Sequence, residues 1–202
     1  MTRLILIRHG QTDWNKTGRI QGQLDIPLNA ESRRQIQSII SGVVHLKGVK
    51  RIDALYSSQL SRSWETAEGI GKIFKLKVKR LRELNELNQG IWQGLLEKQV
   101  MKRYKRLYNV WKEKPLATKP PKGESVMEAC DRIIPAIQKI IARHKGQTIC
   151  IVTHEIVSAI IKSYYKKIDM NKIWQNLPKN ASWEVLEIKS IPPLSLRGVL
   201  GE

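Results

Sequence analysis

Apolar and polar residues follow two patterns along this chain, and together they predict strands that alternate with helices. Short unbroken apolar runs, such as Leu4–Ile7 and the stretch 147–153, are typical of strands buried on both faces. Longer segments carry apolar residues three or four positions apart, which is typical of amphipathic helices, and the clearest spans about 125–144. This alternation predicts an α/β fold, a three-layer α/β/α sandwich around a mostly parallel central sheet.

The other elements are predicted in the same way. We expect further helices over about 30–44, 59–74 and from 154 through Tyr165, and short strands over about 54–56, 77–79 and 183–188. Asn29 is a suitable cap for the helix that begins near residue 30. Pro135 lies inside the helix at 125–144 and predicts a kink or a break there.

The chain has the length of a single domain, which we place at residues 1–190, followed by a tail over 191–202. A segment over about 95–121 has the character of an inserted lid. Its apolar residues Val100, Tyr104, Leu107 and Trp111 share one helical face, and lysines and arginines occupy the other.

Composition narrows the functional classes. No stretch approaches the roughly 20 apolar residues that a membrane-spanning helix needs, so we expect no membrane partner. The run Leu4–Ile7 is too short for the apolar core of a signal peptide, which favours a cytoplasmic protein. Cys130 and Cys150 are expected to be buried free thiols, and no spacing of ligands indicates a metal site.

The net charge of +18 attracts anions, and nucleic acid, an anionic membrane surface or a phosphorylated substrate would each be compatible with it. Tyr104, Tyr108 and Trp111 are interleaved with basic residues, a pattern also found in proteins that bind single-stranded nucleic acid. Their spacing of three and four is, however, the ordinary pattern of an inward-packed helix. We therefore favour a lid whose lysines face solvent over a nucleic-acid partner.

Polar side chains follow three of the predicted strands. Arg8-His9-Gly10 ends the first strand, Ser57, Ser58 and Arg62 follow the second, and His154 and Glu155 follow the strand at 147–153. In parallel sheets these strand ends meet at one edge, where ligands bind. Arginine presents a planar fork that fits phosphate oxygens, and a neutral imidazole can attack phosphorus. Each element alone is a weak signal, but their joint placement predicts phosphate chemistry.

The chain resembles the histidine phosphatase superfamily, which includes cofactor-dependent phosphoglycerate mutase. Five signatures match in order. They are Leu6–Thr12 with Trp14 and Asn15, Tyr56–Arg62 with Thr66 and Ala67, Leu84–Glu86 leading into Gly90–Gly94, Gly123–Ser125, and Val152–His154. Residues Asn180–Ser182, which enter the last strand, extend the likeness to about residue 188.

The resemblance implies that His9 forms a phosphohistidine intermediate without a metal or other cofactor. It implies a catalytic set of His9, Glu86, His154, Arg8 and Arg62, in which Glu86 protonates the leaving oxygen and then activates water. Glu83 competes with Glu86 for that role, but the distance from Glu86 to Gly90–Trp92 matches the family pattern. The substrate-binding residues that we assign are Arg8, Asn15, Gln21, Gly22, Arg62, Glu86, His154 and Glu155.

The expected activity is hydrolysis of a small phosphorylated metabolite. The alternative is a phosphoglycerate mutase, but mutases of this family usually carry longer insertions, and only about 28 residues separate Gly94 from Gly123. Glu155, Gln89, Gln93 and Ser32 depart from residues common in the family, so they leave the particular phosphomonoester open. A homodimer that pairs through the strand at 183–188 also stays open.

Overall fold

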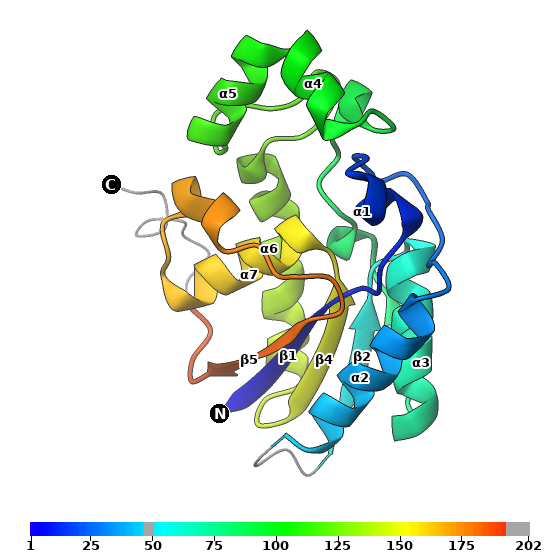
Figure 1. The fold of residues 1–202 in the computed structure, drawn as a ribbon. Coiled ribbons are helices and arrows are strands. Elements are labelled where there is room, and N and C mark those ends of the chain that lie inside the picture. Colours follow the sequence, from blue (N-terminus) through cyan, green and yellow to red (C-terminus); the bar gives the residue numbers. More distant parts are fainter. Residues whose placement is uncertain (47–50, 193–202) are drawn as a thin grey trace.

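A five-stranded sheet forms the centre of the protein in the computed structural model, which describes residues 1–46 and 51–192 (Figure 1). The strands are β1 (Thr2–Arg8), β2 (Ala54–Ser57), β3 (Val78–Arg80), β4 (Thr148–Thr153) and β5 (Trp183–Ile188). Their order is β3-β2-β4-β1-β5. The first four strands are parallel and β5 pairs antiparallel with β1, so the predicted mostly parallel sheet is confirmed.

Helices cover both faces of this sheet. The helices are α1 (Asp13–Thr17), α2 (Ser32–Val44), α3 (Ser61–Phe74), α4 (Glu97–Arg103), α5 (Lys105–Glu113), α6 (Val126–Arg143) and α7 (Glu155–Lys166), with 3-10 turns η1 (Arg82–Leu84), η2 (Gly90–Trp92) and η3 (Met170–Gln175). Figure 1 shows α2 and α3 side by side on one face and α6 and α7 on the other. The predicted three-layer sandwich is therefore confirmed.

The alternation of side chains along the buried strands divides the core between these layers. In β1, Leu4 and Leu6 belong to the cluster that packs against α6 and α7, whereas Ile5 and Ile7 belong to the cluster that packs against α2 and α3. All four side chains are at most 2% exposed. An apolar run without alternation is what a strand needs when helices cover both of its faces.

The predicted helix at 125–144 corresponds to α6, which continues through Pro135 without a break. A proline costs a helix one backbone hydrogen bond and crowds the preceding turn. Here the apolar stripe on both sides of Pro135 is buried, including Ile133, Ile134 and Ile137, and this burial outweighs the local cost. The helix predicted from residue 30 begins at Ser32, whose N–H donates to the Asn29 side chain.

The segment predicted as a lid contains α4 and α5, which lie beyond the carboxyl ends of the strands (Figure 1). The backbone leaves the helical conformation at Tyr104, so the shared apolar face is divided between two helices. The two ends of the segment meet where the N–H of Ile91 donates to the Pro121 carbonyl at 3.0 Å. Gly90 permits this contact because its φ is +50° and a Cβ there would collide with the Pro121 carbonyl. The domain boundaries stay predictions, and the tail lies outside the described residues from 193 onward.

Aromatic side chains join the lid to the body of the protein. Trp92 is fully buried, and its ring centroid lies 5.4 Å from that of Trp111 in α5. Trp111 in turn packs against Trp174 of η3, with centroids 4.2 Å apart. Rings in edge and tilted contact bury a large apolar area, so this aromatic cluster is the main attachment of the lid.

Two expectations from composition can be compared with the structure. Cys130 and Cys150 are buried and free, which confirms that prediction. Among the described residues, no helix has the length and apolar character to cross a membrane. The cytoplasmic location stays a prediction.

Replacing Trp92 by alanine should lower the free energy of unfolding by about 3–5 kcal/mol, because it leaves a cavity between the lid and the body. Ile91→Ala is the matched control: the neighbouring side chain is 40% exposed and its loss should cost about 0.5 kcal/mol or less. Urea denaturation measures both values. Equal losses in the two variants would contradict the anchoring role of Trp92.

Candidate active site

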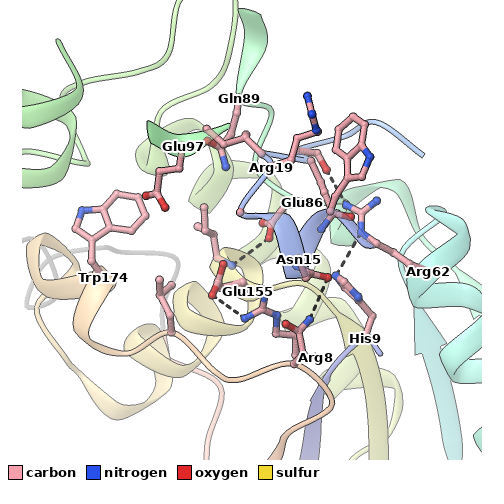
Figure 2. A pocket seen from close by; sticks show the side chains of 18 of the residues that line it. Arg8, His9, Asn15, Arg19, Arg62, Glu86, Gln89, Glu97, Glu155 and Trp174 are labelled. Carbon is pink, nitrogen blue, oxygen red and sulfur yellow. Dashed lines mark hydrogen bonds and ion pairs between the residues drawn. The ribbon is translucent and has the colours of Figure 1, made fainter. Parts of the chain in front are cut away.

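Most of the predicted site residues line one cavity at the carboxyl edge of the sheet, and Figure 2 shows Arg8, His9, Asn15, Arg62, Glu86 and Glu155 there. His9 follows β1, Ser58 follows β2 and His154 follows β4, while Arg62 lies in the first turn of α3. The parallel pairing of β1, β2 and β4 places these strand ends next to one another. The cavity at this edge has a volume of about 350 Å³, and Arg8, His9, Arg62 and Glu86 line it.

Hydrogen bonds fix the tautomer of His9. Its Nδ1 lies 2.6 Å from the carbonyl oxygen of Gly10, which can only accept, so Nδ1 carries the proton. Its Nε2 accepts from Nε of Arg62 at 3.3 Å. The lone pair of the imidazole is therefore on Nε2, the nitrogen that lies beside the guanidinium of Arg62.

The surroundings of His9 keep this ring neutral. Burial lowers the pKa of His9 well below its usual value, and the charges of Arg62 and Arg8 lower it further. At neutral pH the ring is consequently unprotonated on Nε2. A neutral imidazole can act as a nucleophile through its unprotonated nitrogen, whereas an imidazolium cannot.

Arg62 is held rigidly by the loop that follows α1. The side chain is 1% exposed, and its terminal nitrogens donate to the carbonyl oxygens of Leu24 at 2.8 Å and Gly22 at 2.7 Å. Gly22 has a φ of +54°, and a Cβ there would collide with the Gln93 side chain, so this tight loop requires glycine. The predicted residue Gly22 thus contributes through its backbone.

Arg8 is fixed by an ion pair. Its guanidinium donates to Oε1 of Glu155 at 2.6 Å and to the Pro178 carbonyl at 2.6 Å. Arg8 is 8% exposed, while about a third of the Glu155 side chain is exposed, and both residues line the cavity. Glu155 therefore orients one of the two arginines that line the cavity with His9.

His154 lies behind His9 instead of at the surface of the cavity. It is completely buried, its ring centroid is 5.1 Å from that of His9, and its Nε2 is 2.7 Å from the Ser58 hydroxyl. Burial, together with the nearby charge of Arg62, lowers the pKa of His154 well below its usual value. The structure thus places a second neutral imidazole against the first, but it does not place His154 among the cavity-lining residues.

Glu86 lies inside the cavity, and Glu83 does not. The Glu86 carboxylate accepts from the backbone N–H groups of Leu87 at 2.8 Å and Ile156 at 3.3 Å. Its loop is held by Arg132, which donates to the backbone carbonyls of both Glu86 and Glu83. Burial raises the pKa of Glu86, and the charge of Glu155 raises it further. These influences favour the protonated form of Glu86 in the cavity that His9 also lines.

The remaining predicted residues come from the loop after β1, from α1 and from the loop that follows α1. Asn15 and Gln21 line the cavity, and Oδ1 of Asn15 accepts from Nδ2 of Asn180, which leaves the Asn15 amide N–H groups as donors. Thr12, which follows the first strand, is fully buried and caps α1. No group of three or more His, Cys, Asp or Glu side chains with the geometry of a metal site occurs among the described residues.

The sequence pattern did not predict the residues that form the outer part of the cavity. The additional lining residues come from α1 and the loop after it, from the start of η2, from the lid and from the segment around η3. They include Trp14, Arg19, Gln89, Glu97, Tyr108, Trp111, Lys112, Trp174, Leu177 and Asn180. The spacing of the lid aromatics predicted that they pack inward, and Tyr108 and Trp111 do so. It could not show that the same side chains also form a wall of the site, because the opposite wall comes from a different part of the chain.

The arrangement suits an attack on phosphate. A neutral imidazole lies beside two guanidinium groups that match phosphate oxygens, and a carboxyl group with a raised pKa lines the same cavity. These are the groups needed to bind a dianion, attack phosphorus and protonate a leaving oxygen.

The chain matches a known protein family by sequence. The profile of the histidine phosphatase superfamily (branch 1) matches residues 4–193. The chain is 29% identical to phosphoserine phosphatase 1 of Hydrogenobacter thermophilus over 94% of this chain and 88% of that protein. It is 33% identical to a metal-independent phosphoserine phosphatase of Arabidopsis thaliana, over 83% and 69% of the two chains.

A solved structure agrees with these relatives. Mycobacterial glucosyl-3-phosphoglycerate phosphatase superposes with a TM-score of 0.82 over 92% of both chains, at 28% identity. The family match covers nearly the whole chain. The relatives include these phosphatases and also phosphoglycerate mutase-like protein 4 of Arabidopsis thaliana, which is 36% identical over 81% of this chain and 70% of that protein. The chain belongs to the histidine phosphatase superfamily and is a phosphatase of that type.

Proposed function

We propose that this enzyme hydrolyses small phosphomonoesters without a metal, through a phosphohistidine formed on Nε2 of His9. The observation that carries the proposal is the His9 tautomer: the Gly10 carbonyl takes the Nδ1 proton, and Nε2 is left with its lone pair beside Arg62. A nucleophile in this state needs no further base before it attacks.

In the first step, Nε2 of His9 forms a bond to phosphorus as the bond between phosphorus and the ester oxygen breaks. The departing alkoxide takes a proton from the carboxyl group of Glu86, and the alcohol leaves. Burial favours the protonated form of Glu86, since it raises the pKa of that group. Arg8 and Arg62 stabilise the charge on the transferring phosphoryl group, and Asn15 supplies a further donor.

In the second step, a water molecule attacks the phosphorus of phosphohistidine. The Glu86 carboxylate accepts the water proton, the bond between phosphorus and nitrogen breaks, and inorganic phosphate leaves. His9 returns to its neutral form and Glu86 to its protonated form, so one ester and one water yield one alcohol and one phosphate. In this scheme the completely buried His154 supports the ring of His9 and binds the phosphoryl group only through a rearrangement.

The cationic charge that a metal would supply comes here from the two guanidinium groups. The name of the Arabidopsis relative, a metal-independent phosphoserine phosphatase, supports the same route in this chain. The size of the cavity, about 350 Å³, supports a small substrate.

Phosphate release from a panel of phosphomonoesters in EDTA tests the proposal. The wild-type enzyme should retain its activity in EDTA, and His9→Ala should lose at least about 10³-fold in kcat because the nucleophile is absent. Rapid-quench experiments with labelled substrate should detect an acid-labile phosphoenzyme in the wild type only. Activity that survives in His9→Ala would mean that another group is the nucleophile.

Glu86→Gln should lower kcat by about 10²–10⁴-fold for alkyl phosphates, because glutamine cannot protonate the leaving oxygen. The loss should be smaller for p-nitrophenyl phosphate, whose leaving group needs little protonation. In the wild type, kcat/KM should fall as pH rises through the raised pKa of Glu86, and this alkaline limb should disappear in the variant. Glu83→Gln is the control, and an equal loss in that variant would contradict the assignment.

The alternative activity is transfer of phosphate between the positions of phosphoglycerate. A mutase must shield its phosphoenzyme from water, whereas the lid here consists of two short helices, α4 and α5. We therefore expect 3-phosphoglycerate to yield inorganic phosphate, with little 2-phosphoglycerate even when a bisphosphate primer is added. Product analysis by NMR measures both outcomes, and rapid isomerisation would favour the mutase.

A further inference from the structure

The wall of the cavity opposite His9 carries a positively charged side chain, that of Lys112. Figure 2 shows Trp174 and Glu97 on the side of the pocket opposite to His9 and Arg62. The ammonium group of Lys112, on α5, lies 4.8 Å from the centroid of the Trp174 ring. It also lies 5.8 Å from the rings of Tyr108 and Trp111, and all four residues line the cavity.

The carboxylates of the cavity already have other partners. Glu155 pairs with Arg8, Glu97 accepts from the Tyr108 hydroxyl, and Glu86 accepts from two backbone N–H groups. Within the part of the chain that the structure describes, Lys112 has no carboxylate within ion-pair distance and makes no side-chain hydrogen bond. Among the described residues, its ammonium group instead lies against the three aromatic rings.

We propose that Lys112 binds a second anionic group of the substrate, so that the enzyme prefers phosphomonoesters whose alcohol portion carries an additional negative charge. This inference rests on the proposed function, because it assigns the phosphate to the end of the cavity at His9 and Arg62. The second anion then lies at the aromatic wall formed by Tyr108, Trp111 and Trp174.

Lys112 is better placed to bind a substrate than an ordinary surface lysine is. The neighbouring Lys114 is exposed and does not line the cavity, whereas Lys112 is half-buried and faces it. The three rings restrict where its ammonium group can lie, so less freedom is lost when an anion binds. A half-enclosed site also screens an ion pair less than bulk water does.

Two matched pairs of substrates test the proposal. Phosphoserine differs from phosphoethanolamine by one carboxylate, and 3-phosphoglycerate bears a carboxylate where glycerol 3-phosphate bears a hydroxymethyl group. A carboxylate is chosen because the enzyme cannot hydrolyse it. We expect the wild type to favour the carboxylate-bearing member of each pair at least tenfold in kcat/KM, chiefly through KM. Added salt should weaken this preference.

Lys112→Met should lower the preference about tenfold, because methionine keeps much of the aliphatic contact with the rings but removes the charge. Lys112→Arg should retain most of the preference, and the control Lys114→Met should retain all of it. An unchanged preference in a folded Lys112→Met protein would overturn the proposal.

The substrate preference of the wild-type enzyme tests the proposal even if Lys112→Met fails to fold. An enzyme that hydrolyses both members of each pair equally well has no such subsite, and the proposed phosphatase activity then stands without it. An enzyme that hydrolyses none of the four esters, nor p-nitrophenyl phosphate, contradicts the proposed function and the subsite together.

Discussion

The guanidinium group of Arg62 is buried in the centre of the protein with neutral partners. Its three recorded acceptors are the carbonyl oxygens of Gly22 and Leu24 and Nε2 of His9, and no carboxylate lies within ion-pair distance of it among the described residues. A buried charge without a counter-ion is costly, and the fold must hold it in place by other means. The carboxylates of Glu86 and Asp25 offset this charge at longer range. A bound phosphate group would bring negative charge into direct contact with the guanidinium group, which matches phosphate oxygens.

Burial, with a smaller contribution from the charge of Arg62, shifts the pKa values of the neighbouring His9 and Glu86. Burial is the larger influence on His9, but Arg62 adds to it, and together they lower the pKa of the imidazole so that its lone pair is available. The pKa of Glu86 shifts in the other direction. Burial and the charge of Glu155 raise it, while the charge of Arg62 lowers it. A neutral base and a protonatable acid can thus coexist in one cavity at neutral pH, since desolvation disfavours the charged form of each.

The two ends of the cavity have different architectural origins. The inner end is built from the ends of β1, β2 and β4, whose positions are fixed by hydrogen bonds in the sheet and by apolar cores on both faces. The outer end is built from the lid and η3, which meet through contacts between aromatic rings. Rigid strands suit the reacting groups, while a wall of side chains on short helices can differ between relatives without disturbing the chemistry.

The sequence by itself determined the layered fold and the groups around His9. Unbroken apolar runs indicate strands covered on both faces, and the parallel sheet that such strands form brings His9, Arg62 and His154 to one edge. Only the tertiary structure placed His154 behind His9, excluded Glu83 from the cavity and brought Lys112 to the outer wall. The reason is physical: strand ends are positioned by local periodicity and sheet pairing, whereas these three side chains are positioned by packing between segments far apart in the chain, which leaves no periodic signal in the sequence.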